Sequence, residues 1–585
     1  MKEAIFHKTD SEYIYALSKD KYMVKLRTKK NDVRKINILY YDRFNYPYNN
    51  ISAAEMQKKA SDELFDYHEA AIDVGTASIG YVFELFDGIE KIYYGNYIFS
   101  NEFSTEMHSV FMMPAIAEKD IFVVPGWARE SIVYQIFPER FHNGDPSNDP
   151  PNTQPWDSDI ADEGMLGGDL QGIIDSLDYI EELGADTIYL TPIFEADTSH
   201  KYNTFDYFKI DKRFGTLDTL RELVKQAHKR NMRIILDAVF NHCGLQFPPF
   251  RDAKVKGERS RYKDWFDFGN SSSELDLPAD YRTFGYVASM PKLMTKNEAT
   301  AEYLMNVATY WIKEADIDGW RLDVADEVDH HFWREFRKTV KKVKPDALIV
   351  GEVWYDGRSW LNGDQFDTVM NYIFRDALER FIALESLTVE EFDSRLGFIR
   401  GAYKAQAYDL LWNLISTHDT VRFLYAADGE VRKLELAVLV QMTFTGVPTI
   451  YYGDEVGMTG GKVPECRRGM VWDNDKQNRE LLDFYKRLIS LRKKYKALQM
   501  GDFKVVCIDN DRKIYGYQRE YNGQRIKVFL NNGRDVQRVY IPADSACVYD
   551  EINNAKYQPA GNKIGIDIGP KSGVLLVESK GDDAS

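Results

Sequence analysis

Charged side chains that could act together in catalysis follow the apolar runs in the middle of the chain. Arg321 and Asp323 lie two residues apart. Trp320, Leu322 and Val324 alternate with them and predict a short strand. Because side chains on a strand alternate between its faces, the Arg and the Asp are predicted to point the same way. The guanidinium would favour an ionised carboxylate, which suits Asp323 to nucleophilic attack. A structural salt bridge is the alternative for this pair taken alone.

Three further strand-like runs end in acids or histidines. They are Asp237 and His242 after the third run, Glu352 after the fifth, and His418 and Asp419 after the seventh. In a parallel barrel all strands carry their C-terminal ends to one rim, where active sites lie. An acid after a strand often caps the next helix. Four strands that each deliver such a residue to one rim are better explained by an active site.

Two of these carboxyl groups suit the hydrolysis of a glycosidic bond. One carboxylate attacks the anomeric carbon, while a carboxylic acid protonates the leaving oxygen and later activates water. The acid requires a pKa of about 6–7, which burial and nearby negative charge supply. Glu352 has valine and Trp354 neighbours and is predicted to be the acid, with Asp323 as nucleophile. Sugar hydroxyls are predicted to be bound by Asp419, His242 and His418; no H-x-x-x-H pair supports a zinc site.

The elements that would position these residues form an alternating series. Strands are predicted over 132–137, 187–191, 233–240, 319–325, 347–354, 366–370, 411–416 and 449–452. Amphipathic helices are predicted between them; after Asp329, for example, Phe332, Phe336, Val340 and Val343 recur at helical spacing. The alternation predicts an α/β protein with a (β/α)8 TIM barrel. A doubly wound sheet is the alternative, but no G-x-G-x-x-G motif follows the first run.

Further segments flank and interrupt the barrel. Residues 1–121 alternate as short strands and predict an N-terminal β-sandwich. The barrel is predicted over 122–242 and 299–500, and residues 243–298 form an inserted domain B after the third strand, because so long a connection is unusual in a compact domain. Residues 501–585 predict a C-terminal β-sandwich.

Composition restricts the partners. The chain has 585 residues, 14% of them aromatic, and a formal net charge of −17, which argues against nucleic acid and anionic membranes. Aromatic rings are suited to stacking on the C–H faces of sugars. The four cysteines are far apart and form no C-x-x-C pair, so they predict neither a zinc site nor a disulfide framework. Neither a signal peptide nor a membrane span is predicted, and a cytoplasmic location is expected.

The strand ends together resemble the four signature regions of the α-amylase family of glycoside hydrolases. Met290-Pro-Lys-Leu293 resembles the fifth-region signature of the branch that contains neopullulanases, cyclomaltodextrinases and maltogenic amylases, and Val324-Ala-Asp-Glu327 is similar to the Val-Ala-Asn-Glu of that branch. The resemblance implies Asp323 as nucleophile, Glu352 as acid/base and Asp419 as transition-state stabiliser.

The same resemblance implies a set of residues that bind the sugar. Around the central sugar they are Arg321, His242, His418 and Asp237, with the ring of Tyr202 stacked beneath it. Near the acceptor they are Phe284, Trp354 and Glu327. Two positions depart from the branch: Asp326 stands in place of Asn, and Val463 in place of the Asp that relatives often carry beside Arg467. Arg467 is still expected to bind substrate.

A calcium site is also expected from the resemblance. Oxygen-bearing residues cluster at 143–149 and 167–169, and calcium takes six to eight oxygen ligands. Chemistry alone favours an ordinary polar turn, but residues at matching positions in this branch hold a structural Ca²⁺. They are Asn143, Asp145, Asn148, Asp149, Gly167 and Asp169.

The expected activity is that of a retaining α-glucan hydrolase. It would cleave α-1,4 and some α-1,6 bonds in cyclomaltodextrins, pullulan and maltooligosaccharides, with transglycosylation. An oligo-1,6-glucosidase or a general α-amylase of the same family is the nearer alternative. A non-catalytic carbohydrate-binding barrel is disfavoured because Asp323 and Glu352 are both present. In this branch the N-terminal domain commonly contributes to a homodimer that narrows the substrate cleft.

Overall fold

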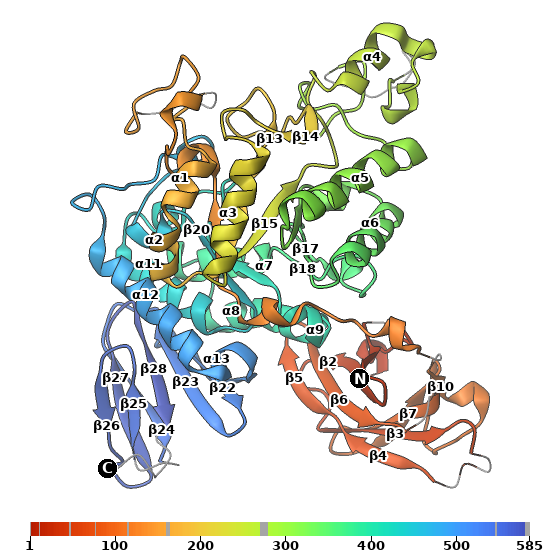
Figure 1. The fold of residues 1–585 in the computed structure, drawn as a ribbon. Coiled ribbons are helices and arrows are strands. Elements are labelled where there is room, and N and C mark those ends of the chain that lie inside the picture. The colour runs from red at the N-terminus through yellow and green to blue at the C-terminus, as the bar shows by residue number, and fades with distance from the viewer. Residues whose placement is uncertain are drawn as a thin grey trace. The chain divides into compact units, whose positions relative to one another are not determined.

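The computed structural model describes residues 2–10, 12–45, 48, 50–75, 78–113, 116–158, 164–269, 279–543 and 547–578. Parts of the predicted inserted domain, 270–278, and of the predicted C-terminal domain, 544–546 and 579–585, lie outside these ranges. The chain divides into two compact units (Figure 1). The first contains residues 1–123, 358–364 and 387–408, and the second contains 124–357, 365–386 and 409–585.

The first unit contains a β-sandwich. Its described strands are β1 (Ile14–Ser18), β2 (Lys21–Lys29), β3 (Lys35–Asp42), β4 (Ser52–Glu55), β5 (Gln57–Ser61), β6 (Phe65–Asp73), β7 (Ile79–Phe86), β8 (Lys91–Gly95), β9 (Ile98–Ser100) and β10 (Phe111–Met112). One sheet has the order β1-β2-β6-β5, and the other has the order β4-β3-β7-β8-β9, with β10 beside β7. Alternating side chains such as Val24, Leu26, Ile38 and Phe83 fill the core between them.

Two helices from the middle of the chain belong to this first unit. They are α8 (Val389–Ala402) and α9 (Ala405–Tyr408). Gly397 and Gly401 let α8 approach the sandwich, because a Cβ at these positions would come within 1.8 Å of the Ser61 carbonyl oxygen and 2.4 Å of the Tyr67 ring. The buried Lys25 ammonium donates to the carbonyl oxygens of Gly401, at 3.0 Å, and of Tyr403.

The second unit is built on a barrel of parallel strands. In the described residues, eight strands form one sheet in the order β18-β17-β16-β15-β12-β11-β20-β19. Their bounds are β11 (Val133–Ile136), β12 (Thr187–Leu190), β15 (Arg233–Ala238), β16 (Gly319–Leu322), β17 (Leu348–Gly351), β18 (Thr368–Val369), β19 (Trp412–Leu414) and β20 (Val447–Tyr451). A parallel bridge between Met370 and Trp412 joins the two ends of this order and closes the barrel. The predicted TIM barrel and its strand series are confirmed.

Helices cover the barrel strands. They are α1 (Leu170–Asp175), α2 (Leu177–Leu183), α3 (Leu217–Lys229), α5 (Glu298–Ala315), α6 (His330–Val343), α7 (Tyr372–Leu378), α10 (Phe423–Ala426), α11 (Val431–Thr443) and α12 (Arg479–Lys494). The next helix, α13 (Lys496–Met500), packs instead against β22 (Ile514–Tyr521) and β23 (Gln524–Asn531). Phe332, Phe336 and Val340 of α6 are buried as predicted, whereas Val343, at its last position, is exposed. Residues 352–367 between β17 and β18 contain a 3-10 turn (Arg358–Trp360) and no α-helix.

The connections that leave the C-terminal ends of β12 and β15 carry additional structure. The hairpin of β13 (Phe194–Glu195) and β14 (Asp206–Ile210) follows β12, and α4 (Pro248–Lys256) follows β15. Aromatic rings in tilted and edge-to-face contact, including those of Phe247, Phe250 and Trp265, pack this inserted segment. Its chain returns along the active-site rim, where Lys292 pairs with His242 in an antiparallel bridge.

The C-terminal part of the second unit is formed of antiparallel strands. They are β21 (Asp502–Asp509), β22 (Ile514–Tyr521), β23 (Gln524–Asn531), β24 (Gln537–Pro542), β25 (Val548–Asp550), β26 (Ala555–Tyr557), β27 (Lys563–Ile568) and β28 (Ser572–Glu578). One sheet has the order β21-β22-β23-β28-β25-β26, and β24 pairs with β27. Apolar side chains such as Phe529, Ile541, Ile566 and Val574 fill the core between them. Across the described residues, no helix has the length and apolar character needed to span a membrane.

Candidate active site

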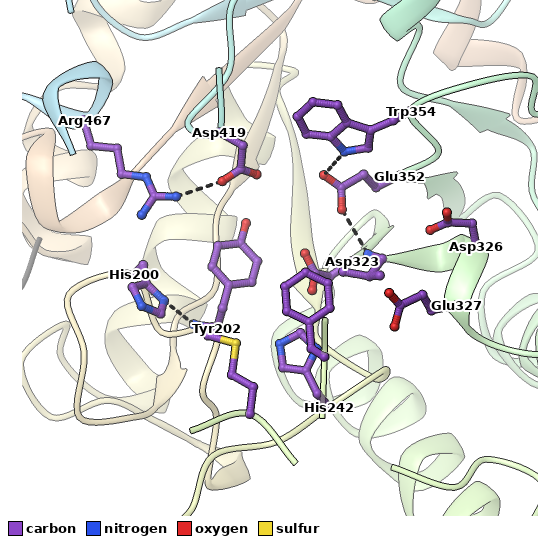
Figure 2. Close-up of a pocket in the computed structure, with 13 residues that line it drawn as sticks. His200, Tyr202, His242, Asp323, Asp326, Glu327, Glu352, Trp354, Asp419 and Arg467 are labelled. Atoms are coloured by element: carbon purple, nitrogen blue, oxygen red, sulfur yellow. Dashed lines mark hydrogen bonds and ion pairs between the residues drawn. The ribbon is translucent and has the colours of Figure 1, made fainter. Parts of the chain in front are cut away.

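A cavity of about 420 Å³ opens at the C-terminal ends of the barrel strands. Its lining residues are His200, Tyr202, His242, Phe284, Met290, Asp323, Val324, Asp326, Glu327, Glu352, Trp354, Asp419 and Arg467. In Figure 2, Asp419 and Arg467 lie on one side with His200 and Tyr202, while Glu352, Trp354, Asp326 and Glu327 lie on the other. Nine of the predicted catalytic and binding residues are thus brought to one cavity.

The buried guanidinium of Arg321, on β16, organises the carboxylates of the cavity. Its Nη1 donates to Oδ1 of Asp323 at 2.8 Å and to Oδ2 of Asp237 at 2.9 Å. Its Nη2 forms an ion pair with Oε1 of Glu352 at 2.6 Å. One fixed cation therefore faces three buried carboxyl groups.

Asp323 directly follows β16 and presents one oxygen to the cavity. Arg321 binds only its Oδ1; Oδ2 is buried and has no hydrogen-bond partner among the described residues. A buried carboxylate oxygen without a partner is energetically unfavourable and is available to an incoming electrophile. This geometry suits a nucleophile.

The protonation of Asp323 differs from the expectation. Burial raises the pKa of Asp323 well above its usual value; Arg321 opposes this, but the charges of Glu352, Asp237 and Asp419 add to it. The expected ionisation of Asp323 took account of the Arg321 guanidinium but not of the surrounding carboxylates. The acids of the neighbouring strands therefore favour the protonated form of Asp323, against the effect of Arg321.

Glu352 directly follows β17 and is held by several donors. The backbone N–H of Val324 donates to Oε2 at 2.9 Å, and the indole N–H of Trp354 donates to Oε1 at 3.2 Å. The Tyr372 hydroxyl lies 3.5 Å from Oε1. Tyr372 also stacks on Trp354, with ring centroids 4.2 Å apart. These contacts fix the carboxyl group beside the nucleophile.

Val324 is not the strand residue that its alternation with Arg321 and Asp323 predicted. Strand β16 ends at Leu322, and Val324 has a left-handed backbone conformation with φ 44° and ψ 48°. A β-branched residue rarely adopts this conformation, because its Cβ is crowded by the backbone. The turn aims the Val324 N–H at Glu352, which accounts for the end of the strand.

Asp419, in the loop after β19, lies between two basic groups. Its Oδ1 accepts from Nη2 of Arg467 at 2.8 Å, and its Oδ2 is 2.9 Å from Nε2 of His418. Burial opposes ionisation, but His418 and then Arg467 outweigh it and hold the pKa of Asp419 below its usual range. Asp419 is therefore ionised and can stabilise positive charge on a sugar.

Aromatic and imidazole rings form the cavity walls. The Tyr202 ring stacks on His418 with centroids 5.4 Å apart, and its hydroxyl donates to Oδ2 of Asp237 at 3.0 Å. His242 stacks on Phe284 with centroids 4.9 Å apart. Burial lowers the pKa of His242 to about 3, and its Nε2 has no hydrogen-bond partner among the described residues. A neutral imidazole with a free nitrogen suits a sugar hydroxyl.

Three predicted sugar-binding residues lie beneath the cavity wall. Arg321, Asp237 and His418 are fully buried and contact lining residues instead of forming the wall. Their contacts with Asp323, Tyr202 and Asp419 hold the lining side chains in place. The structure therefore places these three residues as supports of the wall.

The two acids after Val324 have different environments. Oε2 of Glu327 accepts from Nδ2 of Asn241 at 3.1 Å and forms an ion pair with Lys292 at 3.5 Å. Oδ2 of Asp326 accepts from the Tyr355 hydroxyl at 2.8 Å. Val463, the second departure from the branch pattern, is 38% exposed and does not line the cavity.

Sequence reasoning missed several residues of the site. They are Gln135, His200, Lys292, Tyr355 and Tyr372. The amide of Gln135 lies 2.7 Å from Nδ1 of His418 and orients its ring. Its signal was a polar residue inside the otherwise apolar run 132–137. For Tyr372 the chain offered no signal, because the pairing of β17 with β18 brings it to Glu352 from the next strand.

The six predicted calcium ligands lie together near the start of α1. Asp169 caps this helix and also accepts from Nδ2 of Asn148 at 2.9 Å. Nδ2 of Asn143 donates to Asp149 at 3.0 Å, and a Cβ at Gly167 would come within 2.2 Å of Asp149. The Oδ1 atoms of Asn143 and Asn148 are buried without hydrogen-bond partners. In the described residues no group of three or more His, Cys, Asp or Glu is arranged for a metal, so amide and carbonyl oxygens would have to contribute.

Known proteins match both the catalytic and the N-terminal parts of the chain. Residues 135–470 match the family described as "Alpha amylase, catalytic domain", and residues 1–117 match "Alpha amylase, N-terminal ig-like domain". The chain is 48% identical to neopullulanase 2 of Thermoactinomyces vulgaris, over 92% of each chain. It is 40% identical to the intracellular maltogenic amylase of Bacillus subtilis (strain 168), over 92% of each chain.

A solved structure supports the same assignment. A cyclomaltodextrinase matches with a TM-score of 0.94 and 41% identity, covering 99% of this chain and all of the other. The match extends over the barrel that carries Asp323, Glu352 and Asp419 and over both flanking β regions. The chain belongs to the α-amylase family of glycoside hydrolases, in the branch of neopullulanases, cyclomaltodextrinases and maltogenic amylases.

Proposed function

We propose that this enzyme is a retaining α-glucan hydrolase that acts on cyclomaltodextrins, pullulan and maltooligosaccharides. It cleaves α-1,4 and some α-1,6 bonds and also transfers glycosyl groups to sugars. The names of the relatives support this substrate range. The observation that carries the mechanism is the unpartnered Oδ2 of Asp323 in the cavity, beside a Glu352 held on the same guanidinium.

The reaction proceeds in two steps. Oδ2 of Asp323 attacks the anomeric carbon while Glu352 protonates the departing glycosidic oxygen, and a covalent glycosyl-enzyme forms. Glu352 then removes a proton from water, or from a sugar hydroxyl, which attacks the same carbon and releases Asp323. Asp419, ionised beside His418 and Arg467, stabilises the positive charge of the sugar in both transition states.

Arg321 supports retention of configuration. It binds Asp323 and Glu352 through the two terminal nitrogens of one guanidinium, which keeps the two carboxyl groups close. Retaining enzymes separate these groups by about 5–5.5 Å, whereas inverting enzymes leave room for a water between them.

The substrate range is tested by parallel digestion of β-cyclodextrin, pullulan and starch. We expect maltose from β-cyclodextrin, panose from pullulan and the slowest turnover on starch, because a cleft narrowed by the proposed homodimer would favour small substrates. Fastest turnover of starch with β-cyclodextrin untouched would refute the substrate proposal.

Substrates whose leaving groups differ in acidity distinguish the nucleophile, Asp323, from the acid, Glu352. Asp323→Asn should lose turnover of both β-cyclodextrin and α-glucosyl fluoride, since both need the nucleophile. Glu352→Gln should lose β-cyclodextrin turnover by about 10³-fold or more and still release fluoride, since fluoride departs without a proton. Circular dichroism checks that both variants fold. Near wild-type activity of Asp323→Asn on either donor would overturn the nucleophile assignment.

We also propose that Asn143, Asp145, Asn148, Asp149, Gly167 and Asp169 hold a structural Ca²⁺. The donor set fits, since two buried amide oxygens lack partners and burial, followed by the charges of Asp169 and Asp145, raises the pKa of Asp149. Saturating Ca²⁺ at about 100 times its Kd should stabilise the EDTA-treated protein by about 2.7 kcal/mol. Asp149→Ala should lose this response; an unchanged melting temperature of the wild type would refute the site.

A homodimer and a cytoplasmic location complete the proposal. The first unit exposes large apolar side chains, including Phe44 at 77%, Ile89 at 94% and Tyr97 at 81%, which suit a protein–protein interface. The name of the Bacillus subtilis relative supports the location. Light scattering after gel filtration should give twice the chain mass; a monomer at micromolar concentration would exclude a stable dimer.

A further inference from the structure

The acceptor side of the cavity carries a carboxylate, Asp326, that forms no ion pair within the described residues. Glu352 is the proposed acid, so the leaving group, and later the acceptor sugar, lies on its side of Asp323. Asp326 and Glu327 line that side (Figure 2). Both would face the ring of an acceptor, yet their surroundings differ in charge.

Glu327 is already compensated. Lys292 pairs with its Oε2 at 3.5 Å and also donates to its backbone carbonyl at 2.9 Å. Burial lowers the pKa of Lys292, and Glu327 is the foremost group that opposes this. The ammonium of Lys292 therefore belongs mainly to Glu327, with Asp326 as a weaker neighbour.

Asp326 has a neutral partner. Its Oδ2 accepts from the Tyr355 hydroxyl at 2.8 Å, and within the described residues it forms no ion pair. The pKa of Tyr355 is raised, first by burial and then by its hydrogen bond to Asp326, so the hydroxyl stays protonated. This bond orients the carboxylate without cancelling its charge.

We propose that Asp326 makes the acceptor subsite selective for sugars that carry an ammonium group, so that glycosyl transfer to an amino sugar is favoured over transfer to its neutral counterpart. The inference rests on the proposed transglycosylation. A protonated amine gains an opposite charge in a partly buried cavity, where ion pairs are less screened than in water. A neutral sugar offers Asp326 only hydroxyl donors.

The experiment is a competition between acceptors. The enzyme is given β-cyclodextrin with equal concentrations of glucose, glucosamine and N-acetylglucosamine, at a pH where NMR shows the free amine to be protonated. We expect transfer to glucosamine to exceed transfer to glucose about five-fold, equivalent to roughly 1 kcal/mol. N-acetylglucosamine, which lacks the charge, should not share the advantage. The preference should shrink in about 1 M NaCl, where the Debye length is about 3 Å.

Three variants test whether Asp326 is the source of the preference for glucosamine. Asp326→Asn should bring the glucosamine-to-glucose ratio to within about two-fold of unity, because it keeps the shape and removes the charge. Glu327→Gln removes an equal charge that Lys292 already neutralises and should keep the ratio. Tyr355→Phe leaves the Asp326 charge in place and should also keep it.

The outcomes separate this inference from the proposed function. No consumption of β-cyclodextrin would refute the proposed function itself. Consumption with equal transfer to glucose and glucosamine would overturn the selectivity alone. Consumption with no transfer product would refute the proposed transglycosylation and, with it, the selectivity. A preference that survives in Asp326→Asn, or that disappears equally in Glu327→Gln, would show that Asp326 is not its source.

Discussion

At the scale of single residues, a few cationic side chains form the ion pairs of several acids in the site. Arg321 contacts Asp323, Asp237 and Glu352, and Asp419 relies on His418 and Arg467. Loss of one of these cations is therefore expected to change the protonation of the carboxylates that it contacts.

Arg467→Met tests this dependence through pH. Asp419 has a pKa held low by His418 and Arg467 despite burial, so it is ionised over the working range. Removal of the Arg467 charge raises that pKa, and activity should then be lost at a higher pH as the solution is acidified. The measurement is kcat against pH on β-cyclodextrin. Lys462→Met removes an exposed charge nearby and should leave the acidic limb unmoved.

The residues of the site were predictable where motif and strand end coincide. Asp323 and Glu352 directly follow their strands, Asp419 lies in the loop after β19, and all three line the cavity. The burial of Arg321 and His418 beneath the wall was not predictable, because spacing gives the direction of a side chain but not the depth of the layer it reaches. The raised pKa of Asp323 depends on acids from other strands and could not be derived from its own segment.

At the scale of elements, helix caps connect the rim to the barrel. Asp329 follows the acidic pair Asp326 and Glu327 and begins α6: its Oδ1 accepts from the Phe332 N–H at 2.9 Å, and its Oδ2 accepts from the Thr295 hydroxyl at 2.7 Å. The cap thus ties α6 to the segment that precedes α5.

Asp329→Ala should lower the free energy of unfolding by about 1–2 kcal/mol, through the lost cap and the lost bond to Thr295. Chemical denaturation with urea measures this. Glu335→Ala removes a carboxylate from the same helix, where it pairs with Lys338 at an exposed position, and should change stability by at most about 0.5 kcal/mol. Equal effects of the two substitutions would argue against the cap.

The periodicity of the sequence identified the barrel strands. It did not show, for each helix, which hydrophobic core that helix packs against. The runs of β16 and β17 are short, apolar and buried, so their type was clear. α8 falls between two barrel strands in sequence, yet Gly397 and Gly401 fit it closely against the sandwich of the first unit. A helix pattern shows that one face is buried and cannot show which partner covers it.

At the scale of the whole molecule, buried histidines make the fold sensitive to acid. Burial lowers the pKa of His7 to about 3, of His68 to about 4, and of His200 and His242 to about 3. His7 is held by the Lys25 carbonyl at 2.7 Å and the Tyr81 hydroxyl at 2.8 Å. These groups bind protons more readily when unfolded, so their stabilising contribution is present above the unfolded pKa near 6.5.

We expect the stability of both units to fall as pH drops from about 6.5 toward 4. Each fully buried histidine contributes a slope of up to about 1.4 kcal/mol per pH unit over that window. His7→Gln, which cannot titrate, should be less stable at pH 7 but should show a shallower decline. Thermal unfolding across pH measures both; parallel curves for the two proteins would contradict the assignment to His7.

At Val324 the active site gives up some stability of the fold for activity. Its left-handed backbone is unfavourable for a β-branched residue, yet it directs the N–H that holds Glu352. Val324→Gly should relieve this strain and keep or raise the melting temperature, while a more flexible turn lowers kcat. Directed evolution for thermostability alone would therefore be expected to sacrifice this turn, and selection for turnover would be expected to keep it.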